Sequence, residues 1–158
     1  MTESADAREL GEVFSLTGAF DSEGTVLSGL PHSREIGMRV HYSGDSQAVL
    51  SVDWNEKLIG DPQSGVMHGG VITALLDTAC GAAVMAVPEK LDTIATLDLR
   101  IAYMRPATKG LRVYCRAECY RLTRSIAFTR AVAFHDDPAD PVASASGTFI
   151  VERREAKA

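Results

Sequence analysis

One almost wholly apolar segment contains a single carboxylate, and it constrains the fold more than any other part of the chain. Residues 64–88 read SGVMHGGVITALLDTACGAAVMAVP, and from Val71 to Val87 the apolar residues fall on every side of a helix. This pattern predicts a helix enclosed by protein rather than one resting on a surface. An acid inside such a helix, here Asp77, needs either a hydrogen-bonding partner or a function.

The length of this segment raises the question of a membrane span. Four polar residues interrupt it, namely His68, Thr73, Asp77 and Thr78. An acid at the centre of a bilayer costs about 2.5–3.5 kcal/mol on insertion scales. We therefore expect no membrane helix, and we interpret the segment as a buried helix of a globular domain.

The residues at the start of this helix can attract negatively charged oxygen. Gly69 and Gly70 permit a tight turn and a close approach of the backbone, and the first N–H groups of the helix point at whatever lies in front of them. Asp77 follows about two turns later and could border the same cavity. Either the helix terminus holds an oxyanion while Asp77 drives an attack, or the glycines form a plain turn and Asp77 is a buried acid with its hydrogen bonds satisfied.

Length and charge limit the organisation of the chain and its partners. At 158 residues, the chain is best interpreted as one domain over 35–152, preceded by an N-terminal helix and loop over 1–34 and followed by a polar tail at 153–158. Its formal net charge of −5 argues against a nucleic-acid partner that binds through a basic surface.

The cysteines and the N-terminal residues indicate the compartment. Cys80, Cys115 and Cys119 show no C-x-x-C pairing and no His at zinc spacing, so we expect reduced thiols and no metal site. The N-terminal MTESADARELGE is charged and has no apolar core, so no secretory signal is expected. Together these features predict a cytoplasmic protein.

Alternating apolar and polar residues predict a sheet. A hairpin is expected from two runs, 36–42 and 48–54, and four strands are expected after Pro88, at 92–103, 111–122, 126–135 and 142–151. The strand at 92–103 is expected to bury one face. One hairpin, one long helix and four strands in this order predict an α+β fold in which an antiparallel sheet curls around the helix.

A resemblance to a known family lies in the HGG turn, in the helix that contains LLDTACGAA and in the TLDLRIAYMRPA that follows. From about Gly60 to Val151, the chain resembles the PaaI-type acyl-CoA thioesterases of the hotdog fold. In that family a curved antiparallel sheet wraps around a long central helix, and two subunits pair into a continuous sheet with the sites at their interface. The resemblance implies hydrolysis of an acyl-CoA by a homodimer, or by a tetramer of two dimers. It implies no cofactor, since CoA is part of the substrate.

The chemistry expected of such a site needs no metal. The Gly69 N–H, assisted by the helix dipole, would stabilise the oxyanion, and such donors contribute about 3–4 kcal/mol. Asp77 would either deprotonate a water molecule or attack the carbonyl to give a mixed anhydride. His68 could orient the turn, or donate to the thioester oxygen or sulfur.

The resemblance assigns further residues. Thr96 lies where relatives carry a Ser or Thr whose hydroxyl reaches the attacking water, or the Asp, from the neighbouring subunit. In relatives an Asn or Gln usually lies six residues before the His, where this chain has Pro62, and its role could pass to Gln63, Asp61 or Asn55 or be absent. The substrate-binding candidates are Gly70, Gln63, Arg105, Arg124 and Ser125, with the arginines suited to the phosphates of CoA.

Two other functions stay open on the sequence. Hotdog dehydratases act on hydroxyacyl thioesters with a His and an acid, but their His lies in a different motif. A non-catalytic acyl-CoA binding or sensing module would keep the arginines and an apolar tunnel; Pro62 favours it mildly, whereas Asp77 argues against it. Aryl, medium-chain and long-chain acyl groups are all compatible with the sequence.

Overall fold

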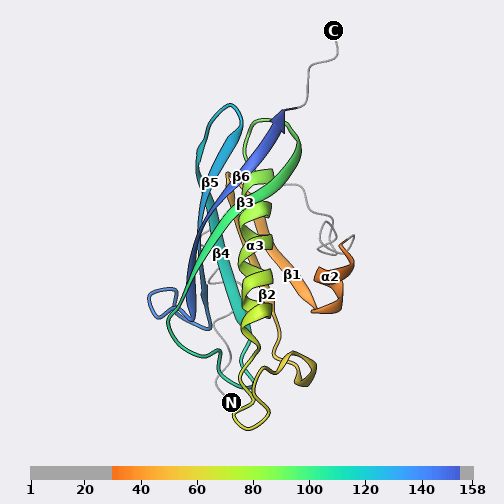
Figure 1. The fold of residues 1–158 in the computed structure, drawn as a ribbon, viewed down its shortest axis with the longest axis vertical. Helices are drawn as coiled ribbons and strands as arrows, with labels where there is room; N and C mark the ends of the chain where they lie inside the picture. The colour runs from red at the N-terminus through yellow and green to blue at the C-terminus, as the bar shows by residue number, and fades with distance from the viewer. Residues whose placement is uncertain (1–29, 154–158) are drawn as a thin grey trace.

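The computed structural model describes residues 30–153, which form a six-stranded antiparallel sheet with one long helix lying along it (Figure 1). The predicted helix near the N-terminus and most of the polar tail fall in residues 1–29 and 154–158, outside the described residues. In chain order the elements are α2 (Pro31–Glu35), β1 (Met38–Gly44), β2 (Gln47–Val52), η2 (Glu56–Leu58), α3 (Gly69–Met85), β3 (Leu91–Tyr103), β4 (Val113–Leu122), β5 (Ile126–Phe134) and β6 (Ala143–Arg153).

The strand order explains how one sheet can enclose a helix. The strands are arranged β1-β2-β4-β5-β6-β3, and every neighbouring pair is antiparallel. Helix α3 contacts all six strands, including the two edges β1 and β3, so the sheet curves around it. This is the predicted α+β arrangement, and the predicted hairpin is present as β1 and β2.

Helix α3 is enclosed on one side only, so the prediction of a helix buried all round is wrong for the described chain. The side packed on the sheet carries eight buried residues, Val71, Ile72, Leu75, Leu76, Ala79, Cys80, Ala83 and Val84. The opposite side carries every fourth residue, Gly69, Thr73, Asp77, Gly81 and Met85, and these side chains are half-buried or exposed. A spacing of four places them on one stripe, which we call the uncovered stripe. Asp77 is therefore at an accessible surface of the helix.

Strand β3 also differs from expectation. It was expected to bury one face, yet among its apolar residues Leu97 is 57% and Tyr103 is 53% exposed. The strand lies at the sheet edge beyond β6, and its pairing with β6 shifts register between Thr96 and Asp98. A shift of register moves side chains to the other face, so the simple alternation read from the sequence breaks down there.

The three thiols are free and buried. Burial raises the pKa of Cys80 to about 11, raises that of Cys119, and holds that of Cys115 well above its usual range. Since the thiolate is the reactive form, we expect Ellman's reagent at pH 8 to react slowly with the native protein. Denaturation should release three fast-reacting thiols, whereas fast native reaction of any one of them would contradict this burial.

Within residues 30–153, no helix combines the length and the apolar character needed to cross a membrane. In the same part of the chain, no three His, Cys, Asp or Glu side chains are grouped so that they could hold a metal ion.

Candidate active site

The first turn of α3 is capped by His68. The Nδ1 atom of its ring accepts a hydrogen bond from the Gly70 N–H at 2.8 Å, and its backbone N–H donates to the Leu58 carbonyl at 2.8 Å. Because Nδ1 is an acceptor, the proton of the neutral ring lies on Nε2. His68 therefore orients the turn, and its Nε2–H meets no acceptor within residues 30–153.

The N–H groups of this turn are not equally available. The Gly70 N–H is taken by His68, and the Val71 N–H donates to the His68 carbonyl at 2.9 Å. The Gly69 N–H is the first of the helix and has no acceptor among residues 30–153. It is therefore a free donor at the positive end of the helix dipole, as an oxyanion hole requires. Gly70, expected on the substrate side, uses its N–H within the protein.

Asp77 lies on the uncovered stripe and is oriented by Thr96. The Thr96 hydroxyl donates to Asp77 Oδ1 at 2.9 Å, while no described residue donates to Oδ2. The resemblance implied that this hydroxyl comes from the neighbouring subunit, but the structure makes the bond within one chain. The reason is that β3 runs beside the uncovered stripe, where Thr96 reaches Asp77 and Tyr103 reaches Thr73.

Gly69 and Asp77 do not share a cavity in one chain, contrary to the sequence prediction. Eight residues of helix separate them by roughly 12 Å along the axis, and even a side chain that leans toward the N-terminus does not close this gap. A nucleophile or base and an oxyanion donor must each lie about 3 Å from the reacting group, so they can be only roughly 6 Å apart. Within one chain, the Gly69 N–H and the Asp77 carboxylate therefore cannot act on the same reacting group.

Gly69 and Asp77 each line a cavity of their own. The cavity beside Asp77 has a volume of about 380 Å³ and draws on both sheet edges, being lined by Leu30, Val40, Ser43, Asp77, Thr78, Gly81, Ala82, Met85, Ile94, Ala95, Thr96 and Phe149. The cavity beside Gly69 has a volume of about 340 Å³ and is lined by Met67, Gly69, Ile72, Tyr103, Met104, Arg105, Pro106, Ala107 and Val142. The first is mostly apolar, while the second contains Arg105.

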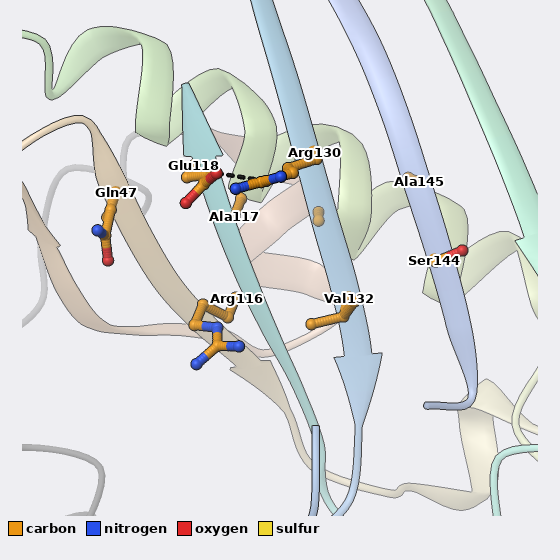
Figure 2. A pocket seen from close by; sticks show the side chains of 9 residues that line it. Gln47, Arg116, Ala117, Glu118, Arg130, Val132, Ser144 and Ala145 are labelled. Carbon is orange, nitrogen blue, oxygen red and sulfur yellow. Dashed lines mark hydrogen bonds and ion pairs between the residues drawn. The ribbon is translucent and has the colours of Figure 1, made fainter. Parts of the chain in front are cut away.

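A larger cavity of about 510 Å³ lies on the face of the sheet that points away from α3. Figure 2 shows its polar side chains, among them Arg116 and the ion pair between Arg130 and Glu118. No predicted site residue lines it. Cavity size is therefore a poor guide to the active site in this chain.

The predicted CoA-binding arginines lie apart. Arg105 borders the Gly69 cavity, and its guanidinium is paired with the Asp140 carboxylate at 3.1 Å. Arg124 and Ser125 lie in the exposed turn between β4 and β5, where the Ser125 carbonyl accepts from the N–H of Val151 near the end of β6. A single chain does not bring this turn to Arg105.

The candidates for the missing amide at the Pro62 position are largely used elsewhere. The Asn55 side chain caps η2 by accepting from the Lys57 N–H at 2.9 Å. The Asp61 carboxylate accepts from the N–H groups of Gln63 and Ser64 and from the Ser64 hydroxyl, which lowers its pKa. Gln63 is exposed on the same loop, and its side chain lines neither site cavity.

Tyr103 was not singled out from the sequence as a site residue. Its hydroxyl lies 2.8 Å from the Gly69 carbonyl and 2.6 Å from the Thr73 hydroxyl. The sequence places Tyr103 at the end of a predicted strand but does not show that this end lies against α3. Its contacts with Gly69 and Thr73 could therefore be found only from the structure.

A six-stranded antiparallel sheet curved around one long helix is the hotdog fold of the thioesterases. The chain belongs to the Thioesterase superfamily, whose model matches residues 64–142, half of the 158 residues. It is a thioester hydrolase, and the resemblance noted in the sequence is confirmed.

One curated relative and two solved structures show the extent of the similarity. The Escherichia coli medium/long-chain acyl-CoA thioesterase YigI is 27% identical over 135 residues, covering 77% of this chain and 86% of YigI. A Pseudomonas aeruginosa crystal structure is 43% identical with a TM-score of 0.71, covering 78% of this chain and 92% of that one. The phenylacetic acid degradation protein PaaI of Thermus thermophilus, solved as a mutant, is 27% identical with a TM-score of 0.67. The match covers 76% of this chain and 97% of the PaaI chain.

Proposed function

We propose that the protein hydrolyses an acyl-CoA or aryl-CoA thioester to the free acid and CoA. The observation that carries this proposal is the free Gly69 N–H at the start of α3, on the same uncovered stripe as Asp77. The similarity to YigI and to PaaI supports CoA thioesters as the substrate class. Three free cysteines suit a reducing compartment, so we also propose a cytoplasmic location.

In the proposed reaction the Gly69 N–H binds the carbonyl oxygen as it becomes negative. Asp77 takes a proton from water, whose oxygen attacks the carbonyl carbon, or it attacks directly to give an anhydride that water then opens. In both routes the carbon–sulfur bond breaks and the CoA thiolate leaves and takes up a proton. Thr96 holds one carboxylate oxygen and leaves the other to react, and the His68 Nε2–H can donate to the thioester.

The separation of Gly69 and Asp77 supports a homodimer in which each site takes one group from each subunit. The exposed edge strand β3 offers the surface for this pairing, since two copies related by a twofold axis pair their edges antiparallel. The same pairing would place Arg124 and Ser125 of one subunit near the end of β3 that carries Arg105 in the other. A tetramer of two such dimers would contain the same sites.

We expect Leu97→Asp to convert the dimer to a monomer and to remove most of the activity. A carboxylate in place of this exposed apolar side chain would be buried and unpaired at the interface of two β3 strands. Light scattering coupled to size-exclusion chromatography would measure the mass. Ile150→Asp is a matched control, because Ile150 is an exposed apolar residue on the interior strand β6. A Leu97→Asp protein that stays dimeric would contradict pairing through β3.

We assign the acyl group to the apolar cavity beside Asp77 and the CoA portion to the side of Arg105. The test of the proposed function is thiol release from a panel of phenylacetyl-CoA, straight-chain acyl-CoAs of increasing length and 3-hydroxyacyl-CoAs, with and without a metal chelator. We expect release that a chelator does not reduce. Binding without release would instead indicate an acyl-CoA binding module, and loss of water from the hydroxyacyl substrates would indicate a dehydratase.

A further inference from the structure

The peptide group between Gly69 and Gly70 is held at both ends by side chains. Its N–H donates to His68 Nδ1 at 2.8 Å, and its carbonyl, that of Gly69, accepts from the Tyr103 hydroxyl at 2.8 Å. The Thr73 hydroxyl lies 3.1 Å from the same carbonyl and 2.6 Å from the Tyr103 hydroxyl. A planar peptide restrained at both ends has a fixed orientation.

The distances indicate which hydroxyl donates directly to the carbonyl. Each hydroxyl has one proton, and the 2.6 Å between the two hydroxyl oxygens requires a hydrogen bond between them, so two arrangements remain. In the first, Thr73 donates to Tyr103 and Tyr103 donates to the Gly69 carbonyl; in the second, Tyr103 donates to Thr73 and Thr73 donates to that carbonyl. The shorter distance to the carbonyl, 2.8 Å against 3.1 Å, favours the first.

The restrained peptide lies directly after the free donor. The Gly69 N–H belongs to the preceding peptide, whose carbonyl, that of His68, accepts from the Val71 N–H. The direction of the Gly69 N–H therefore depends on the backbone angles of Gly69, and glycine has no side chain to limit those angles. Holding the peptides on both sides of Gly69 limits those angles, and the Tyr103 ring also covers Gly69, since a Cβ built there would lie 3.6 Å from the Tyr103 hydroxyl oxygen.

We propose that Tyr103, assisted by Thr73, is a positioning residue that fixes the direction of the Gly69 N–H in the oxyanion hole. This inference rests on the proposed role of Gly69. It makes β3 the strand that orients both halves of the site, because Thr96 holds Asp77 and Tyr103 holds the start of α3. It also gives a reason for the position of Tyr103, whose side chain is half-exposed in the single chain and contributes little to the core.

The test compares Tyr103→Phe with Tyr120→Phe. Both variants remove one hydroxyl from a tyrosine of similar exposure, 53% and 55%, and Tyr120 lies on β4 away from α3. We expect Tyr103→Phe to lower kcat by about tenfold or more with KM and Tm unchanged, since a small misplacement of a catalytic group is costly. Tyr120→Phe should match the unmodified protein. Thr73→Val should lower kcat less than Tyr103→Phe, and the double variant should resemble Tyr103→Phe, because both hydroxyls act on one carbonyl.

Amide exchange gives a readout that is independent of turnover. With glycine labelled by ¹⁵N, the Gly70 N–H should exchange faster in Tyr103→Phe, because the carbonyl of the same peptide loses the shorter of its two side-chain hydrogen bonds. An active unmodified protein with unchanged kcat in Tyr103→Phe would overturn the proposal, as would unchanged exchange of the Gly70 N–H. No thiol release from the unmodified protein would instead refute the proposed function, so the two failures are distinguishable.

Discussion

Asp77→Asn is expected to lower kcat by about 100-fold or more while the fold and the dimer persist. The amide has the shape of the carboxylate, and its oxygen can still accept the hydrogen bond from Thr96. It cannot take a proton from water or form an anhydride, so both proposed routes are blocked. Thiol release measures the loss, and thermal unfolding and light scattering confirm that the protein is otherwise intact.

The matched control is Asp98→Asn, which neutralises an exposed acid on the same strand as Thr96. We expect this variant to keep nearly full activity, because Asp98 lines neither site cavity. An Asp77→Asn protein that retains turnover within a few-fold would show that Asp77 is a structural acid. That outcome would return the site to the second interpretation drawn from the sequence.

Isotope labelling separates the two routes that involve Asp77. In a single turnover in H₂¹⁸O, a general base delivers labelled oxygen to the released acid. In the anhydride route, water that attacks the carboxyl carbon of Asp77 leaves labelled oxygen on the enzyme. Mass spectrometry of the peptide that contains Asp77 reads out the difference.

Gly69→Pro is expected to lower kcat by about 10²–10³-fold, the usual loss when one oxyanion-hole donor is removed. Proline is well tolerated at the first position of a helix, and the preceding residue, His68, already has the extended backbone that proline requires, with ψ at 133°. The N–H that is lost has no acceptor within residues 30–153, so no hydrogen bond of the described chain is broken. The substitution therefore removes the donor with little effect on the fold.

Gly69→Ala is the control for this change. An added Cβ would lie 3.6–3.7 Å from Tyr103, an ordinary contact, and the N–H is kept. We expect turnover close to that of the unmodified protein, and the contrast between Pro and Ala isolates the donor. Equal activity of the two variants would exclude the Gly69 N–H as the oxyanion donor.

Combining the two inactive variants tests whether each site is shared. If Gly69 of one subunit works with Asp77 of the other, a mixed dimer of Asp77→Asn and Gly69→Pro chains contains one intact site and one site that lacks both groups. Mixing the variants with subunit exchange should therefore restore part of the activity. If each site lay within one chain, every site in the mixed dimer would be defective and no activity would return.

The amino-acid sequence by itself determined the secondary structure and the chemistry at the start of α3. Apolar periodicity predicted the hairpin, the long helix and the four later strands, because periods of 2 and 3.6 residues are local properties. The HGG turn predicted a helix terminus with free N–H groups for the same reason, since a helix always leaves its first donors unpaired. The position of Asp77 on α3 also follows from counting along one helix.

Only the tertiary structure decided which of these groups are available and which meet. It assigned the Gly70 N–H to His68 and left that of Gly69 free, and it brought Thr96 and Tyr103 of β3 onto α3. It showed that the sheet leaves one stripe of α3 uncovered although the sequence of this helix is apolar all round, because burial depends on which strands pack against which side. The distance between Gly69 and Asp77 follows from the rise of the helix and is available from the sequence, but only the tertiary structure shows that the two residues line different cavities of the chain. The walls of those cavities come from strands and loops far apart in the sequence, which is why counting along one helix did not predict them.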